Sequence, residues 1–409
     1  MKIYSSFLLT LCLVCSSNAF AESQQDLQKE IKSLQSMVSE LKQLVTQQSQ
    51  RIQTLETRQS ANQAPRPVTT SKSQSGASAT YLPEIGAVAD IVGLSSEDKA
   101  DEEGNDRISA REFEIVIGHD VDPYTRLDAT VAFSDTEDPA LEEAYATLLD
   151  LPFSLNGRLG KFRPKVGKAS PLHRDSLETV DVPLVIQRYL GAEGYAKSGA
   201  ELSGFLPMST DSLTEQLYLG VVEGGAGEEG LLFGETRRRP TFYTHLTTNY
   251  SPSESANFEL GGTYMLGSSD ADSANEVNAF GVDATFSYHP TPVQKIKFQN
   301  EIYFQDRKET QSEGLDQNPY GFYSLLDYRM AERWAMGTRY DWVQPIDLVQ
   351  DDAQRDYEQG FSAYLTFFQS EFARFRLQYQ KLRSVEGGDD NRFFFQGTFA
   401  IGTHKHSIN

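Results

Sequence analysis

Cysteine is nearly absent from this 409-residue chain, and its two copies, Cys12 and Cys15, both lie near the amino end. They fall within the apolar stretch "FLLTLCLVC", which follows Lys2 and precedes the small-residue pattern Ala19-Phe20-Ala21. This arrangement is typical of a secretory signal peptide, and we predict that residues 1–21 are removed on export. A large exported protein without disulfides needs a big core or an extensive hydrogen-bonded sheet for its stability.

Long apolar runs and an excess of positive charge are also missing. After the predicted signal peptide no run of 18 or more apolar residues occurs, so the sequence contains no candidate transmembrane helix. The 37 basic residues are outnumbered by 58 acidic ones, a formal net charge of −21, which argues against nucleic acid as a partner. A bilayer can still be crossed by a closed β-barrel, whose hydropathy signal per strand is weak.

Motifs for catalysis, cofactors and metals are absent as well. The chain has no G-x-S-x-G, and the Gly-rich "GGAGEEG" is not followed by Lys-Ser or Lys-Thr. The paired His404 and His406 are interpreted as a polar tail. The other histidines are scattered without ligand spacing, at His119, His173, His245 and His289. We therefore expect no enzyme activity, no cofactor and no metal site.

A heptad repeat occupies residues 24–58. Its a positions hold Ile or Val and its d positions hold Leu, apart from one Gln. The seam is Leu27, Ile31, Leu34, Val38, Leu41, Val45, Gln48, Ile52 and Leu55. Such a narrow apolar seam among Gln, Glu, Lys and Ser predicts a coiled coil over residues 22–59, and hence self-association. The repeat alone does not decide between a dimer and a trimer.

The pattern changes twice after the heptads. Residues 60–80, "SANQAPRPVTTSKSQSGASAT", are polar and rich in Ser and Thr, which predicts a flexible linker. From residue 81 to 409 apolar residues alternate with polar ones, the period of β-strands. Seven pairs of candidate strands are joined by tight turns, and a first strand near 84–93 and a last near 392–402 remain to close the sheet. We expect about sixteen antiparallel strands.

The connections between these strands alternate between short turns and long, acidic segments such as "GSSDADSANE" and "DRKETQSEGLDQN". Short turns at one end and long loops at the other are typical of outer-membrane barrels. The expected fold is therefore an all-β transmembrane barrel, preceded by the helical coiled coil. Because the amino end enters from the short-turn side, the coil is expected in the periplasm.

The stretch "FARFRLQYQ" (372–380) indicates which way each face looks. Phe375 and Leu377 alternate with Arg374, Arg376 and Gln378, so one face is apolar and the other basic and polar. The apolar face is predicted to contact lipid. The charged face is predicted to line a wet lumen, because unpaired charges in a dry core would be prohibitive.

The layout of residues 81–409 resembles that of the Gram-negative outer-membrane porin superfamily. The sixteen strands with a long third outer connection resemble the trimeric general porins, and the coiled coil is similar to that of carbohydrate porins. The stretch from "GRLGKF" to "AELSGFLP" (157–207) resembles porin-like families labelled phosphate-selective. The resemblance implies a homotrimer in the bacterial outer membrane, surrounded by lipid and lipopolysaccharide.

In the general porins the third loop folds into the channel and narrows it. By layout, the corresponding segment here is 164–198. Mixed charges on such a constriction filter solutes by size and charge. The loop candidates are Lys165, Lys168, His173, Arg174, Asp175, Glu178, Asp181 and Arg188. The wall candidates are Arg158, Arg339, Arg374 and Arg376, with Glu143 and Glu201 as acidic counterparts.

Three functions remain open at this point. The first is a porin for passive diffusion of small hydrophilic solutes. The second is a structural tether, in which the barrel is an anchor and the coiled coil contacts peptidoglycan or a periplasmic partner. The third is a substrate-specific channel for sugars or anions, with Tyr243, Tyr303 and Tyr323 as inward-facing aromatic candidates.

Overall fold

The computed structural model describes most of the chain from residue 83 to residue 402. The described ranges are 83–97, 107–135, 138–210, 212–227, 230–234, 239–269, 275–308, 318–346, 355–385 and 388–402. The predicted signal peptide, coiled coil and linker lie outside these residues. No helix in the described ranges is long and apolar enough to span a membrane.

Sixteen β-strands make up almost all of the regular structure. They are β1 (Glu84–Ser96), β2 (Arg107–Asp122), β3 (Thr125–Phe133), β4 (Ala140–Leu151), β5 (Leu155–Phe162), β6 (Lys197–Phe205), β7 (Leu213–Val222), β8 (Thr241–Ser253), β9 (Ala256–Ser268), β10 (Glu276–Tyr288), β11 (Lys295–Arg307), β12 (Tyr320–Ala331), β13 (Trp334–Val343), β14 (Glu358–Ser370), β15 (Ala373–Arg383) and β16 (Asp389–Gly402). The short helical elements are η1 (Pro152–Ser154), η2 (Arg174–Ser176) and α2 (Leu184–Tyr189).

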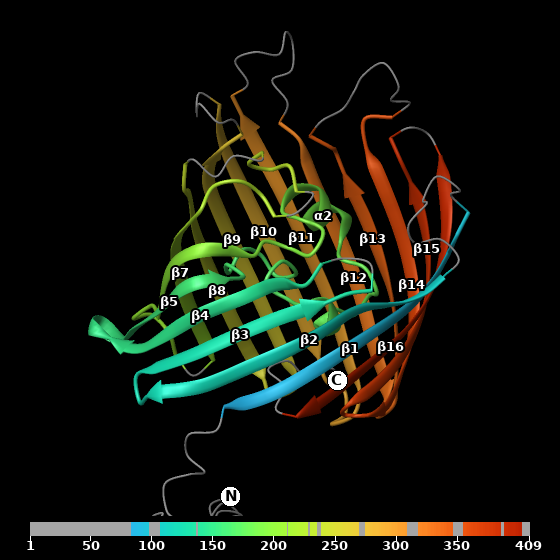
Figure 1. Cartoon of the computed structure of the whole chain (residues 1–409), viewed down its shortest axis with the longest axis horizontal. Helices are drawn as coiled ribbons and strands as arrows, with labels where there is room; N and C mark the ends of the chain where they lie inside the picture. The colour runs from blue at the N-terminus through green and yellow to red at the C-terminus, as the bar shows by residue number, and fades with distance from the viewer. Residues whose placement is uncertain are drawn as a thin grey trace, which may run out of the picture. The chain divides into compact units, whose positions relative to one another are not determined.

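The strands form one closed barrel (Figure 1). Each strand pairs antiparallel with its neighbour in sequence, and β1 pairs with β16 from Gly86 opposite Gly402 to Ser96 opposite Arg392. Closure leaves no strand edge unpaired, which is the condition for a sheet to cross a bilayer. The predicted sixteen-strand antiparallel barrel, including the meeting of its first and last strands, is confirmed.

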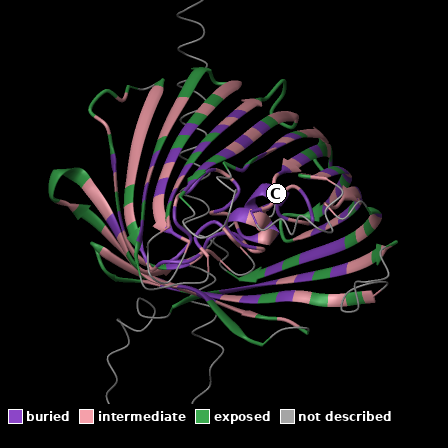
Figure 2. Ribbon diagram, turned by 90° about the horizontal axis from the view of Figure 1, so that it is seen from above, coloured by how far each residue is buried: buried purple, intermediate pink, exposed green. Residues whose placement is uncertain are grey.

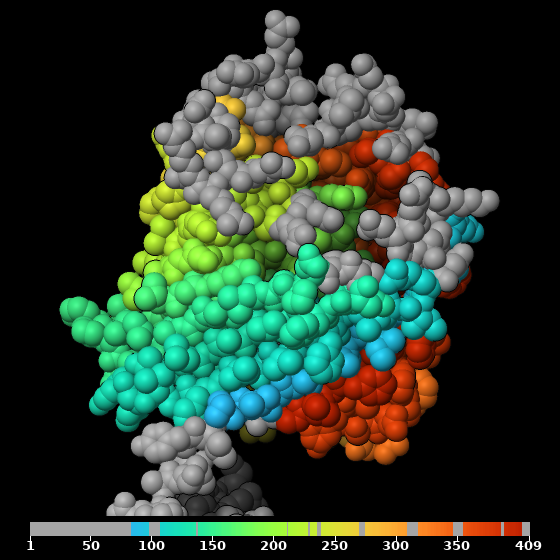
Figure 3. Space-filling view, in the orientation of Figure 1, coloured from blue at the N-terminus to red at the C-terminus, as the bar shows by residue number. Residues whose placement is uncertain are grey.

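The predicted division into two faces is also confirmed. In β15, Arg374, Arg376 and Gln378 are buried, whereas Leu377 is 58% exposed. Buried and exposed residues alternate along the strands in the same way around the barrel (Figure 2). The outer surface over β1 to β4 is continuous (Figure 3) and carries large exposed apolar side chains such as Ile117 and Leu127. This outer face suits contact with lipid.

The connections differ in length as predicted. Turns of two residues, at 123–124, 254–255, 332–333 and 371–372, alternate with longer segments at the other end of the barrel. The longest connection between described strands runs from residue 163 to 196, between β5 and β6, and we call it the lumen loop. It contains η2 and α2, and α2 lies within the barrel beside β12 and β13 (Figure 1).

The hydrophobic core of the protein is built around this lumen loop. Val166, Val185 and Ile186 are fully buried and belong to one apolar cluster with wall side chains such as Tyr323 and Val343. Every residue from 163 to 196 is buried or half-buried. The lumen loop is therefore packed as tightly as a protein core, although many of the wall side chains that point into the barrel are polar.

Two irregularities in the strands change which side chains point inward. The β3–β4 register shifts between Thr130 and Val131, so Glu142 is an extra residue, and both it and Glu143 are buried. The β1–β2 register shifts between Asp90 and Ile91. A β-bulge of this kind re-aims side chains that strict alternation would place on opposite faces.

Candidate functional site: a loop held inside the barrel

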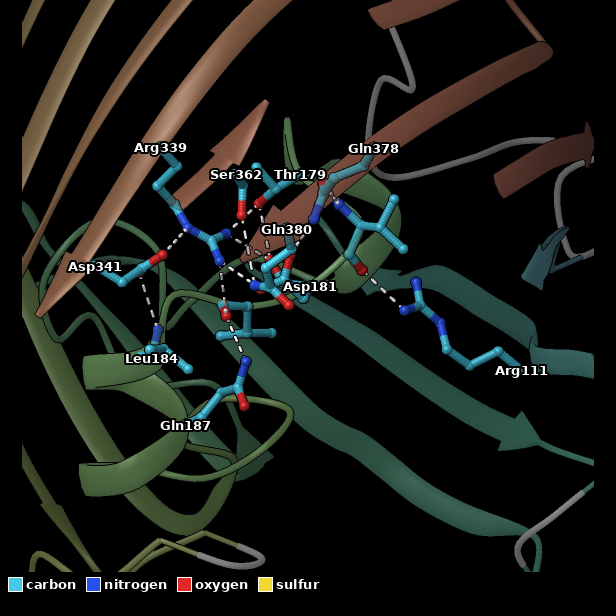
Figure 4. A network of polar contacts seen from close by, with 12 residues as sticks. Arg111, Thr179, Asp181, Leu184, Gln187, Arg339, Asp341, Ser362, Gln378 and Gln380 are labelled. Atoms are coloured by element: carbon cyan, nitrogen blue, oxygen red, sulfur yellow. Dashed lines mark hydrogen bonds and ion pairs between the residues drawn. The ribbon is translucent and has the colours of Figure 1, made fainter. Parts of the chain in front are cut away.

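The most extensive polar contact between the lumen loop and the wall is centred on Arg339 of β13 (Figure 4). Its guanidinium donates to Asp181 Oδ2 at 2.5 Å and to the Asp181 carbonyl at 2.7 Å, and it also donates to Thr179 Oγ1. On the wall side it donates to Asp341 Oδ2 at 2.7 Å. The other oxygen of Asp341 accepts from the Leu184 backbone N–H at 3.1 Å. One arginine thus links the wall to two turns of the loop.

Side chains of β15 reinforce this clamp. Gln378 donates to Asp181 Oδ1 at 2.5 Å and Gln380 to Asp181 Oδ2 at 2.8 Å (Figure 4). Arg374 donates to the Asp175 carbonyl, and Arg376 donates to the Leu177 carbonyl at 2.9 Å. The basic face of "FARFRLQYQ" therefore meets the loop, where it satisfies backbone carbonyls and a carboxylate.

Loop carboxylates keep their charge in this setting. Burial opposes ionisation of Asp181, but Arg339, Gln378 and Gln380 lower its pKa below the ordinary 3.8. Burial likewise opposes ionisation of Glu178, yet Lys297, at 2.6 Å, lowers its pKa below the ordinary 4.5. Both groups are therefore anionic at neutral pH and hold the loop to β11, β13 and β15.

A second anchor is formed by Glu301 of β11. Its carboxylate accepts the backbone N–H groups of Lys168 and Ala169, both at 3.1 Å. It also accepts the hydroxyls of Tyr303 at 2.7 Å and Tyr323 at 2.9 Å. Gly167 precedes this turn with φ +62°, and a Cβ there would lie 1.7 Å from Glu301 Oε1. Only glycine allows the backbone to approach the carboxylate so closely.

A third anchor joins β5, β6 and β8. Arg158 pairs with Glu201 at 2.6 Å, and Glu201 Oε2 accepts the Tyr243 hydroxyl at 2.7 Å and the Lys165 backbone N–H at 3.2 Å. Tyr243, like Tyr303 and Tyr323, points inward as predicted, but all three are buried against carboxylates under the loop. They do not form the exposed aromatic strip that a sugar pathway would need.

The fourth contact centres on His173, which is 1% exposed. Its Nδ1 lies 3.2 Å from Glu114 Oε1 and 3.1 Å from Glu142 Oε2, and its Nε2 lies 3.0 Å from Glu143 Oε2. Burial and Arg163 oppose a charged imidazole, yet Glu114 and Glu142 raise the pKa of His173 well above its ordinary value. The loop is thereby joined to β2 and β4.

The remaining predicted loop residues also have partners in the lumen. Lys168 pairs with Glu259 of β9 at 2.5 Å, and Arg188 pairs with Glu358 of β14 at 2.9 Å. Arg174 pairs with Glu193 within the loop itself at 3.0 Å. Asp175 is buried within η2. All fourteen predicted residues thus lie on the loop or on the wall around it, and their role in a constriction stays a prediction.

One expectation about the inner face is wrong for this region. The inward charges were predicted to face water, but Arg339, Arg374, Glu143 and Glu201 are at most 5% exposed. The premise that a buried charge needs a partner still holds, because these charges are paired or hydrogen-bonded. Their partners are side chains and backbone groups of the lumen loop, which the strand pattern alone does not reveal.

Several important partners were not among the predicted residues. Asp341 and Glu301 follow the inward alternation of their strands and could have been included on that signal. No pattern in the sequence indicated that Arg163, Glu114 and Glu142 lie close together. Their meeting depends on the β4 bulge and on the path of the loop.

A small polar cavity of about 120 Å³ lies between the loop and the wall strands β11 to β15. Its lining includes Glu178 and Asp327 as acidic groups. Its basic lining residues are Lys295, Lys297, Arg329, Arg374 and Arg376. Basic side chains therefore outnumber acidic ones in this cavity, although the chain as a whole is strongly acidic.

Comparison with known proteins agrees with this architecture. Residues 208–367 match the family described as "Putative beta-barrel porin-2, OmpL-like". An uncharacterised protein of Aquifex aeolicus (strain VF5) is 28% identical over 321 residues, covering 71% of this chain and 68% of that protein.

Two solved structures show the same fold at low sequence identity. The anion-selective porin from Comamonas acidovorans has a TM-score of 0.53 and 11% identity, over 78% of this chain and 99% of that one. The outer membrane channel DcaP of Acinetobacter baumannii has a TM-score of 0.52 and 10% identity, over 78% of this chain and 96% of that one. The resemblance to outer-membrane porins that the sequence suggested is thus confirmed at the level of the fold: this chain forms a β-barrel like theirs.

Proposed function

We propose that this protein is an outer-membrane porin, through which small hydrophilic solutes diffuse passively along a channel narrowed by the lumen loop. The observation that carries the proposal is the loop itself. Side chains of seven wall strands contact residues 163–196 and hold them inside the barrel; the strands are β2, β4, β9, β11, β13, β14 and β15. A closed barrel used only as an anchor needs no such mixed-charge insert.

The proposal extends to parts of the chain beyond the described residues. Residues 1–21 serve as the signal peptide, 22–59 as a periplasmic coiled coil, 60–80 as a linker, and 81–409 as the barrel. The coil joins copies of the chain into a homo-oligomer, with a trimer as the expected state. The heptad seam supports this assembly.

The test is single-channel recording of the purified mature protein in a planar bilayer. Stepwise openings are expected, and a deletion of residues 168–195 is expected to enlarge them. A shorter deletion of 310–316, in another long connection, controls for a shortened connection and is expected to leave the unit conductance nearly unchanged. Insertion without conductance in all three proteins would contradict the porin function and favour a tether that acts through its coiled coil.

A preference for anions is the second candidate function, favoured by the basic cavity between loop and wall. Five basic side chains line this cavity, against the two acidic side chains of Glu178 and Asp327. An anionic solute passing this point would meet a positive local field. Under a salt gradient across the bilayer, the sign of the reversal potential should show that anions pass more readily than cations. A reversal potential for cations would exclude this specificity.

A further inference from the structure

The environment of His173 suggests more than a structural contact. One ligand atom from each of Glu114, Glu142 and His173 lies within 4.8 Å of the others, and the side chains come from β2, β4 and the lumen loop. All three residues are at most 5% exposed. We propose that they form a binding site for a divalent transition-metal ion of the Zn²⁺ class, which fastens the lumen loop to the barrel wall.

The distances fit such an ion. His173 Nδ1 lies 3.2 Å from Glu114 Oε1 and 3.1 Å from Glu142 Oε2. In a tetrahedral site with metal–ligand bonds of about 2.0–2.1 Å, neighbouring ligand atoms lie about 3.3 Å apart. An ion can therefore be held by these three atoms after small side-chain adjustments.

Two buried oxygens give independent support. Glu114 Oε2 and Glu142 Oε1 are inaccessible to solvent and have no hydrogen-bond partner among the described residues. A buried carboxylate oxygen without a partner is unfavourable and needs an explanation. A cation bound to both carboxylates supplies one, because each group can coordinate through either or both of its oxygens.

The other side of the imidazole has the partner that metal-binding histidines usually have. Nε2 lies 3.0 Å from Glu143 Oε2, and Glu143 Oε1 accepts the Arg163 backbone N–H at 3.0 Å. A carboxylate that accepts the N–H of one ring nitrogen directs the lone pair of the other toward the metal. Glu143 is thus placed as a positioning residue, with His173 Nδ1 as the ligand.

The charge balance favours a divalent ion over a proton. Five carboxylates gather here, from Glu112, Glu114, Glu142, Glu143 and Glu193. They face three basic side chains, Arg163, Arg174 and His173. For the three proposed ligands alone, a protonated imidazole leaves one negative charge uncompensated, whereas a divalent ion bound to the neutral imidazole leaves none. The nitrogen ligand disfavours Ca²⁺ and Mg²⁺, which prefer oxygen.

The sequence alone predicted no metal site, because the histidines have no ligand spacing. The ligands come from residues 114, 142 and 173 and meet only through the fold. The ion would make the position of the loop depend on metal supply, since His173 lies on the loop and both glutamates lie on the wall.

The test is calorimetric titration of the full mature chain with ZnCl₂ in detergent. His404 and His406 are replaced by alanine throughout, so that the tail cannot bind zinc. One zinc ion per chain is expected, with at least 100-fold weaker binding in His173→Ala and about 10- to 100-fold weaker binding in Glu143→Gln. His245→Ala is the matched control, because His245 is also buried in the lumen but, within the described residues, bonds Thr263 Oγ1 rather than a carboxylate; the zinc affinity of this variant should not change.

A second measurement keeps the proposal testable if His173→Ala does not fold. X-ray absorption at the zinc edge of the parent protein should show one nitrogen and two or more oxygen ligands at about 2.0–2.2 Å. No zinc binding by the parent protein, an all-oxygen shell, or equal affinity in His173→Ala would each overturn the proposal.

Discussion

Replacing Arg339 by glutamine is expected to release the lumen loop from the wall. The guanidinium bonds Asp181 and Thr179 on the loop and Asp341 on β13. Glutamine is too short to span both carboxylates, so Asp181 and Asp341 would face each other without the cation between them. The loop between residues 179 and 184 should then leave its position.

The size of the effect follows from burial. Arg339 and Asp341 side chains are 1% and 0% exposed, and Asp181 is 15% exposed. Removing one partner of a buried ion pair costs about 3–5 kcal/mol, because the remaining charge stays buried. A loss of about 3 kcal/mol shifts the docking equilibrium roughly 10²-fold toward the released loop.

Limited trypsin digestion measures this release. Arg174 and Arg188 lie on the loop and are half-buried in the intact protein. Cleavage after them should be slow in the parent protein and fast in Arg339→Gln, and the unit conductance should become larger and noisier. The matched control is Arg383→Gln on β15, where the Arg383 and Asp389 side chains of the ion pair are 41% and 38% exposed.

The control separates loop release from a general loss of charge. Exposed ion pairs contribute about 0–1 kcal/mol, and the partner of Arg383 is Asp389 of β16 rather than a loop residue, so the Arg383→Gln variant should digest like the parent. If Arg339→Gln were as resistant to trypsin as the parent, with unchanged conductance, the proposed role of the clamp would be refuted.

Three further predictions concern the same loop and the coil. Gly167→Ala should lower the thermal midpoint of unfolding, because its Cβ would overlap the Glu301 carboxylate; Gly262→Ala, where a Cβ meets nothing within 4 Å, is the control. The lowered pKa values of Asp181 and Glu178 stabilise the docked loop at neutral pH. This stabilisation of the docked loop is lost as pH falls below the ordinary pKa values of 3.8 and 4.5. The unit conductance, recorded as a function of pH, should therefore increase only in acid. Deletion of residues 22–59 should abolish oligomers in light scattering yet retain single-channel openings, and loss of conductance would show that the coil is needed for the pore.

The strand pattern predicted the barrel well because its information is local. Side chains alternate with period two, so a row such as Arg374, Arg376 and Gln378 identifies its own face without knowledge of any other strand. Long polar connections between such rows indicate where the sheet turns. The same reasoning placed Arg339 and Glu201 inward. The connection 164–198 was identified differently, by its resemblance in layout to the third loop of the general porins.

The partners of those inward charges were beyond this reasoning. Arg339 meets Asp181 across 158 positions of sequence, and Arg376 meets the Leu177 carbonyl across 199. Nothing in either local pattern specifies the pairing. The expectation of a wet inner face was wrong here for that reason, since the loop supplies the hydrogen bonds that water was expected to supply.

The sequence by itself determined the closed barrel, its apolar outer side, its polar inner side and its porin-like layout, because hydrogen-bonded strands impose a repeat of two residues that each strand shows by itself. Only the tertiary structure decided what fills the barrel. A bulge in β4 turns both Glu142 and Glu143 inward, and the path of the loop carries His173 to them. Such a site depends on register and on packing between distant segments, so no local spacing encodes it.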